Sequence, residues 1–169
     1  MILKDARYAI RAWMLYKAEE KRRNPASSLY TMKSQRGACL HSPFGCFIAD
    51  CSYAFEDYYS WAGAPLPVPL TQDPYTGTLI EHGIEVHSIA DLRVANAVIY
   101  FDGPGFEPST GSHVAGIVEV GPDPLTVSFG WQGEPALVRV SQDGRAHKFF
   151  AYNTMTKGKV HWPPGYKKP

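Results

Sequence analysis

The chain has 169 residues, of which 44% are hydrophobic and 20% charged, and this predicts one domain with a core of ordinary size. The net charge of +1 provides no strong field for a polyanion, so nucleic acid is not an expected partner. No stretch approaches the roughly 18 consecutive apolar residues of a membrane helix, and the N-terminal run MILKDARYAIRAW carries charges where a signal peptide is apolar. We expect neither membrane insertion nor a signal peptide.

Two helices are predicted in the first half of the chain. Apolar residues recur at helical spacing over residues 3–23 and the pattern stops before Pro25. Residues 24–49 have no sustained period and are expected to be irregular. A second helix is predicted from Asp50 to Ala62, with Asp50 as its N-cap and Gly63 at its end. Residues 64–78 are rich in proline and are expected to form a loop or extended chain.

The second half of the chain reads as strands separated by Gly, Pro and Asp turns. The predicted strands span residues 96–101, 113–120, 125–129, 136–140 and 147–152. Short connections favour an antiparallel meander of about five strands with the helices on one side, an α+β class. We expect one domain over residues 1–169, with its core at about 28–153, and a tail over 154–169 that is frayed or docked onto a partner.

Cysteine occurs only at positions 39, 46 and 51, an odd number that leaves at least one thiol unpaired. A zinc site could combine these three with His41. The spacing Cys-x6-Cys-x4-Cys lacks the short Cys-x2-Cys knuckle of zinc sites, so no metal is expected.

The segment Asp50-Cys51-Ser52 is the strongest candidate for a catalytic site. An N-cap at Asp50 places Cys51 in the first helical turn, where the helix dipole favours a thiolate. A buried packing residue is the alternative for such a cysteine. A nucleophilic thiol also needs a base, and His113 is the candidate because it opens a strand directly after a Gly- and Pro-rich loop.

These residues resemble a known family. The run Asp50-Cys51-Ser52-Tyr53-Ala54-Phe55, with Tyr58, Ala62-Gly63 and Leu66-Pro67, is similar to the Asp-Cys-Ser-Gly-Leu-Val, Tyr, Ala-Gly, Leu-Pro signature of NlpC-type cell-wall peptidases. The run from Ser112 to Val118 resembles their Ser-His-Val-Gly-Ile-Tyr segment. Tyr75 to Leu79 with Gly83, and Val127-Ser128 with Gly130 and Pro135, resemble a subgroup found in phage lysins and virion-associated hydrolases. The similarity covers about residues 28–140.

The resemblance implies a papain-like fold in which Cys51 is the nucleophile and His113 the general base, without metal or organic cofactor. It places the oxyanion near the Cys51 amide, between Asp50 and Ser52, with Tyr30 as a further donor.

Two positions depart from the family pattern. Tyr53 stands where Gly or Ser is usual, and Phe129 takes the place of a His that orients the imidazole. Strand alternation puts Ser128 on the face opposite Phe129, so Gln132 or Glu134 is the expected substitute for that histidine.

Two functions follow from the sequence. The first is a peptidoglycan hydrolase, a cysteine endopeptidase or amidase that cuts cell-wall peptide cross-links. It would be phage-encoded, located in the virion tail or in host cytoplasm, with peptidoglycan peptides and other tail proteins as partners. The second is a catalytically weakened or inactive structural component of a tail tip with the same fold. Acyl transfer by the same dyad is a third possibility. A Cys51 thiol close to the His113 ring in an open groove would favour an enzyme.

Overall fold

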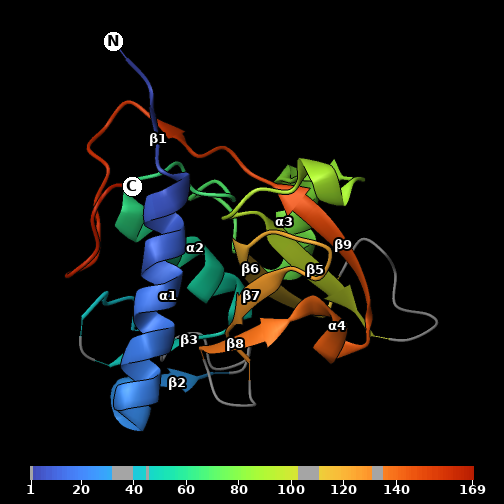
Figure 1. The fold of residues 1–169 in the computed structure, drawn as a ribbon, viewed down its shortest axis with the longest axis horizontal. Coiled ribbons are helices and arrows are strands. Elements are labelled where there is room, and N and C mark those ends of the chain that lie inside the picture. The colour runs from blue at the N-terminus through green and yellow to red at the C-terminus, as the bar shows by residue number, and fades with distance from the viewer. Residues whose placement is uncertain (1, 32–39, 45, 103–110, 131–134) are drawn as a thin grey trace.

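The computed structural model describes residues 2–31, 40–44, 46–102, 111–130 and 135–169. Two long helices pack against one face of an antiparallel sheet (Figure 1), which confirms the predicted α+β class. The helices are α1 (Arg7–Arg23), α2 (Cys51–Ala62), α3 (Thr76–His82) and α4 (Val140–Asp143), with 3-10 turns at Pro25–Ser27 and Ile89–Asp91. The strands are β1 (Lys4–Asp5), β2 (Ser28–Tyr30), β3 (Phe47–Ala49), β4 (Ile84–Val86), β5 (Ala97–Phe101), β6 (His113–Glu119), β7 (Leu125–Ser128), β8 (Ala136–Arg139), β9 (Ala146–Ala151) and β10 (Met155–Thr156).

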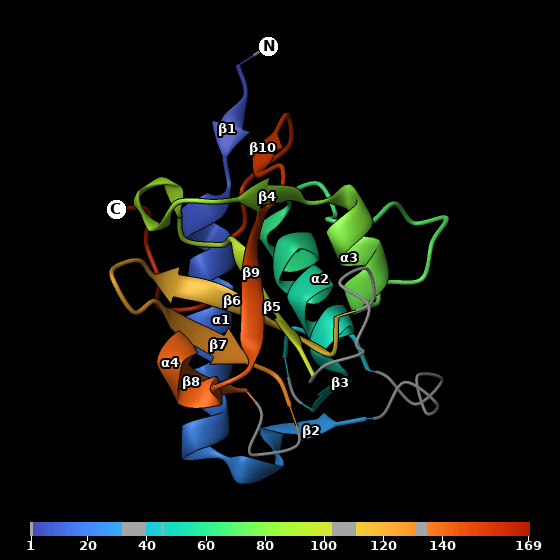
Figure 2. The ribbon, with the colours of Figure 1, turned by 90° about the vertical axis from the view of Figure 1, so that its right-hand side faces the viewer.

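The main sheet has six strands in the order β4-β9-β5-β6-β7-β8, each antiparallel to its neighbours (Figure 2). β5 to β8 form the predicted meander. β9 instead returns to the far edge of β5, so the expectation of one simple five-strand meander was wrong. The reason lies in β5, which is buried at all five positions and therefore needs hydrogen-bonding partners along both edges. β4 adds the sixth strand.

α1 begins later than predicted, at Arg7 rather than at residue 3. Lys4 and Asp5 instead pair with Thr156 and Met155 of β10 in a short antiparallel ribbon. Because β10 satisfies the backbone groups of these residues, they do not join the helix. Farther along, Lys17 is wholly buried.

α2 has the predicted bounds because both of its caps form. The Asp50 carboxylate accepts hydrogen bonds from the amides of Ser52 and Tyr53, each at 2.9 Å. Gly63 ends the helix in the left-handed conformation, with φ of 74°, which glycine adopts at low cost. Between the caps, Phe55 and Tyr58 pack into the core.

α3 was not predicted, since its first turn falls in the proline-rich segment that was expected to be loop. A capping interaction starts this helix: the backbone amide of Tyr75 donates to the Thr78 hydroxyl at 3.0 Å. Leu79 is fully buried, so packing stabilises a short helix that its sequence favours only weakly.

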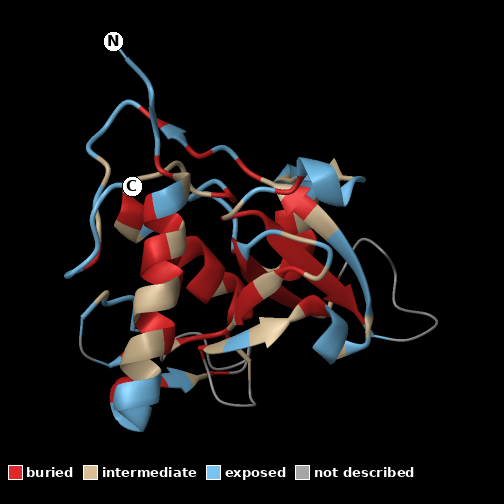
Figure 3. Cartoon of the chain, in the orientation of Figure 1, coloured by how far each residue is buried: buried red, intermediate tan, exposed pale blue. Residues whose placement is uncertain are grey.

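Side chains on the two faces of the main sheet have different surroundings, and the buried core lies between the sheet and the helices (Figure 3). The core beneath α1 and α2 includes Ala97, Ile99, Phe101, Val114 and Val127. A second, smaller cluster on the opposite face contains Val98, Tyr100, Ala115 and Val140. This strict alternation along β5 and β6 determines which side chains can reach α2.

The C-terminal tail docks onto its own chain, contrary to the expectation that it is frayed or bound to a partner. The His161 carbonyl accepts a hydrogen bond from the Trp13 indole at 3.0 Å, and its amide donates to the Ala62 carbonyl at 3.1 Å. Trp162 packs against the main core. The tail therefore packs against the side of α1 and the C-terminal end of α2.

Candidate active site around Cys51

The N-terminus of α2 holds Asp50, Cys51 and Ser52 as predicted, but it buries all three. Asp50 is 3% exposed, Cys51 8% and Ser52 2%. The Cys51 sulfur lies 3.9 Å from the Ser52 hydroxyl. Cys51 thus occupies the first helical turn without opening to solvent.

Burial is the main influence on the pKa of the Cys51 thiol. Desolvation, followed by the negative charge of Asp50, raises the pKa of Cys51 above its ordinary value, against weaker opposing contributions from the backbone amide of Val114 and from Ser52. The expectation that the helix N-terminus lowers this pKa was therefore wrong, because loss of hydration penalises the thiolate.

Cys51 lies in the buried apolar core between the helices and the sheet. Cys51 belongs to the same buried cluster as Val114 of β6 and Phe129, which follows β7. The approach of the helices to β6 is close: a Cβ added at Gly116 would lie 2.3 Å from Met14 Cε and 3.5 Å from the Phe55 ring. None of these neighbours can accept a proton from the thiol.

His113 points to the other face of the sheet. It lies directly opposite Tyr100 in the β5–β6 pair, and opposed residues of an antiparallel pair project to the same face. Its ring stacks on that of Tyr100 with centroids 5.9 Å apart and an interplanar angle of 23°. Tyr100 belongs to the cluster away from α2. The structure therefore does not bring His113 to Cys51, and the expected dyad is not formed.

The partner of His113 among the described residues is Ser128, whose hydroxyl lies 2.7 Å from Nε2. Gln132 and Glu134, the expected substitutes for the orienting histidine, lie outside the described residues. Burial, and then the positive charge of Arg145, lowers the pKa of His113 to about 4. Arg145 is held by Asp143 and Asp102 and stacks on Tyr100, 5.0 Å from the ring centroid. His113 is a neutral, internally hydrogen-bonded residue.

The other two aromatic candidates lie on either side of the α2 N-terminus. Tyr30 pairs in register with Ala49, which precedes Asp50, and its ring centroid is 6.5 Å from that of Phe129. Tyr53 does not narrow a cleft beside Cys51. Its hydroxyl donates to Asp73 at 2.7 Å, so its side chain is directed to the loop between α2 and α3.

A second histidine, which the sequence assigned no role beyond the zinc alternative, lies on the outer side of α2. His41 Nδ1 is 2.8 Å from Asp57 Oδ2, and its ring packs against Tyr53 with centroids 5.1 Å apart. The pattern gave no signal for this pair because His41 precedes α2 in an irregular segment.

Of the cysteines proposed for zinc, Cys46 is exposed and Cys51 buried, both unpaired, and Cys39 lies outside the described residues. Within the described ranges, no three His, Cys, Asp or Glu side chains are placed to hold a metal ion.

No family model, curated protein or solved structure matches this chain significantly. Among the helices that the structure describes, none has the length and apolar character to cross a membrane.

Proposed function

We propose that this chain is a non-catalytic structural or interaction protein, built on a papain-like fold of the NlpC type and assembled into a virion, as in a phage tail tip. The observation that carries the proposal is that β6 turns Val114, not His113, toward Cys51. Cysteine nucleophiles require a nearby base to form the thiolate and to protonate the leaving amine. Val114 supplies neither function.

Three further features agree with this proposal. Cys51 is 8% exposed, so burial restricts the approach of a peptide carbonyl to its sulfur. Phe129, in the place of the orienting histidine, packs against Phe47 with ring centroids 5.0 Å apart. His113 has its own partner in Ser128. Apolar packing thus occupies the positions at which the resemblance to peptidases implies polar groups.

The competing function is the peptidoglycan hydrolase that the resemblance implies. The test is digestion of purified peptidoglycan, measured as new free amino groups and soluble fragments, with wild type and Cys51→Ala in parallel. We expect no difference between the two proteins, because no base lies beside the thiol among the described residues. Release of fragments that Cys51→Ala abolishes would contradict the proposal and restore the cysteine hydrolase.

A further inference from the structure

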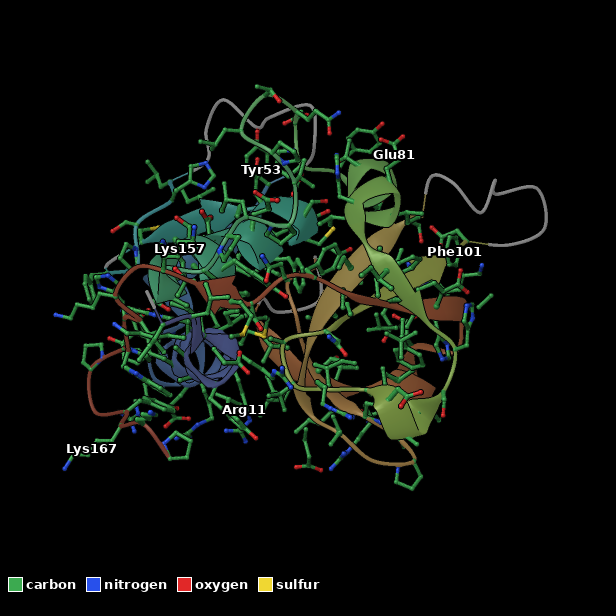
Figure 4. The ribbon with its side chains drawn as sticks, turned by 90° about the horizontal axis from the view of Figure 1, so that it is seen from above. Arg11, Tyr53, Glu81, Phe101, Lys157 and Lys167 are labelled. Atoms are coloured by element: carbon green, nitrogen blue, oxygen red, sulfur yellow. The ribbon has the colours of Figure 1, made fainter. Side chains whose placement is uncertain are left out.

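A groove lies on the outer side of α2, away from the sheet, with a volume of about 510 Å³. One wall is α2 itself, through Tyr53 and Asp57, and the other is the proline-rich loop that leads to α3. Figure 4 shows Tyr53 beside this loop. Neither Cys51 nor His113 is among the described residues that line the groove.

Two buried carboxyl groups line the groove. Glu56 and Asp57 are each 8% exposed. Glu56 Oε1 accepts a hydrogen bond from the Val68 amide at 2.6 Å, and Asp57 Oδ2 faces His41 Nδ1 at 2.8 Å. Each carboxyl thus uses one oxygen in these contacts, and the second oxygen remains a potential acceptor.

Burial of the Glu56 and Asp57 carboxyl groups disfavours their charged forms, and a bound cation would offset this cost. Burial raises the pKa of Glu56 to about 7 and also raises that of Asp57, while Asp57 raises the pKa of His41. No lysine or arginine is among the described residues that line the groove, and His41, which faces Asp57, is the side chain of this wall that can carry a positive charge. A positive group placed here would offset the burial of the carboxylates.

Aromatic and apolar surface borders the carboxyl groups. The Tyr53 ring lines the groove and packs against the His41 ring, with centroids 5.1 Å apart. Leu70, on the opposite wall, is 90% exposed, which suits contact with the residues beside that cation in a protein segment better than binding of a small free amine.

From this geometry we infer that the groove is a docking site for a lysine or arginine side chain of a partner protein, with Asp57 and Glu56 as its counter-ions and Tyr53 and Leu70 as its walls. The inference rests on the proposed role of the chain as an interaction protein and identifies one of its surfaces. Charge complementarity selects the side chain, and the exposed leucine contacts the neighbouring partner residues.

The test uses two capped tripeptides, acetyl-Ala-Lys-Ala-amide and its norleucine counterpart, titrated into the full chain and followed by NMR at the Tyr53 and Asp57 amides and the His41 ring. We expect saturable shifts at these positions with the lysine peptide and an affinity at least about tenfold lower for the norleucine peptide. Asp57→Asn is expected to cause a similar loss, and Glu56→Gln is a second variant that also removes a charge. Ser60→Ala, at the same groove, is the control that leaves binding unchanged.

Equal binding of the two peptides, shifts confined to other surfaces, or full affinity in both charge-removing variants would overturn the inference. If the lysine peptide does not bind and no Cys51-dependent hydrolysis is found, the docking site is disproved but the proposed function is not. Cys51-dependent hydrolysis instead removes the proposed function, whatever the peptides do.

Discussion

His113 illustrates how its surroundings decide the role of a single residue. The ring is buried against Tyr100, its Nε2 meets the Ser128 hydroxyl, and Arg145 adds a positive charge nearby. Burial and the charge of Arg145 favour the neutral imidazole, against weaker opposing contributions from Asp143 and Asp102. The residue that sequence reasoning selected as a catalytic base is thereby a pH-dependent element of stability.

The prediction at this scale concerns acid stability. The pKa of His113 in the folded chain, about 4, lies below the ordinary value of about 6.5. Between these values the unfolded chain takes up a proton that the folded chain does not, so stability falls as pH decreases through this window. His113→Gln removes this loss, which amounts to at most about 3 kcal/mol. Urea unfolding of both proteins at about pH 7 and about pH 4.5 measures it.

His87→Gln serves as the control, because that side chain is 79% exposed and its replacement is expected to leave the acid dependence of stability unchanged. Equal acid sensitivity of wild type and His113→Gln would show that His113 is solvated rather than held neutral.

At the scale of elements, the sequence allows the ends of α2 and the sheet face of His113 to be predicted. The caps of α2, Asp50 and Gly63, could be read from sequence because capping is a local interaction. The face of His113 could also have been read. The family pattern places one residue between His and Gly, whereas Val114 and Ala115 separate His113 from Gly116 here. Because successive strand residues point to opposite faces of the sheet, one extra residue places His on the opposite face relative to Gly.

Other elements depended on contacts distant in sequence. Lys4 and Asp5 leave the predicted helix because β10 pairs with them. β9 joins β5 rather than β8 because a fully buried central strand needs partners on both edges. Local periodicity carries no information on such pairings, so it predicted the segments but not their neighbours.

A second prediction tests the docked tail. A Cβ at Gly63 would lie 2.5 Å from the Lys159 carbonyl oxygen, and Gly63 has φ of +74°. Gly144 has φ of +73° with no atom within 4 Å of such a Cβ. We expect Gly144→Ala to cost about 1 kcal/mol from backbone strain alone, and Gly63→Ala to cost about 1 to 3 kcal/mol more, because the tail must move. Equal losses in urea unfolding would mean that the tail is not held at this position.

At the scale of the whole molecule, the layers of helices and sheet separate the three candidate side chains, Cys51, His113 and His41. Cys51 lies in the interface between α2 and the sheet, His113 on the far face of the sheet, and His41 on the outer side of α2. The sequence predicted the α+β class and the helix that carries Cys51. The spacing from His113 to Gly116 already indicates the face of His113, whereas the position of His41 beside Asp57 depends on packing that no local pattern predicts.

The most direct test of the account is the rate at which iodoacetamide labels Cys51 as a function of pH, in wild type and in His113→Ala, with the exposed Cys46 as an internal reference. Mass spectrometry of the digested protein assigns the label to each cysteine. We expect Cys51 to react more slowly than Cys46 throughout, to gain reactivity only above its ordinary pKa, and to be unaffected by His113→Ala. Rapid labelling of Cys51 below about pH 8 that is lost in His113→Ala would contradict the account, because it would demonstrate an activated Cys–His pair.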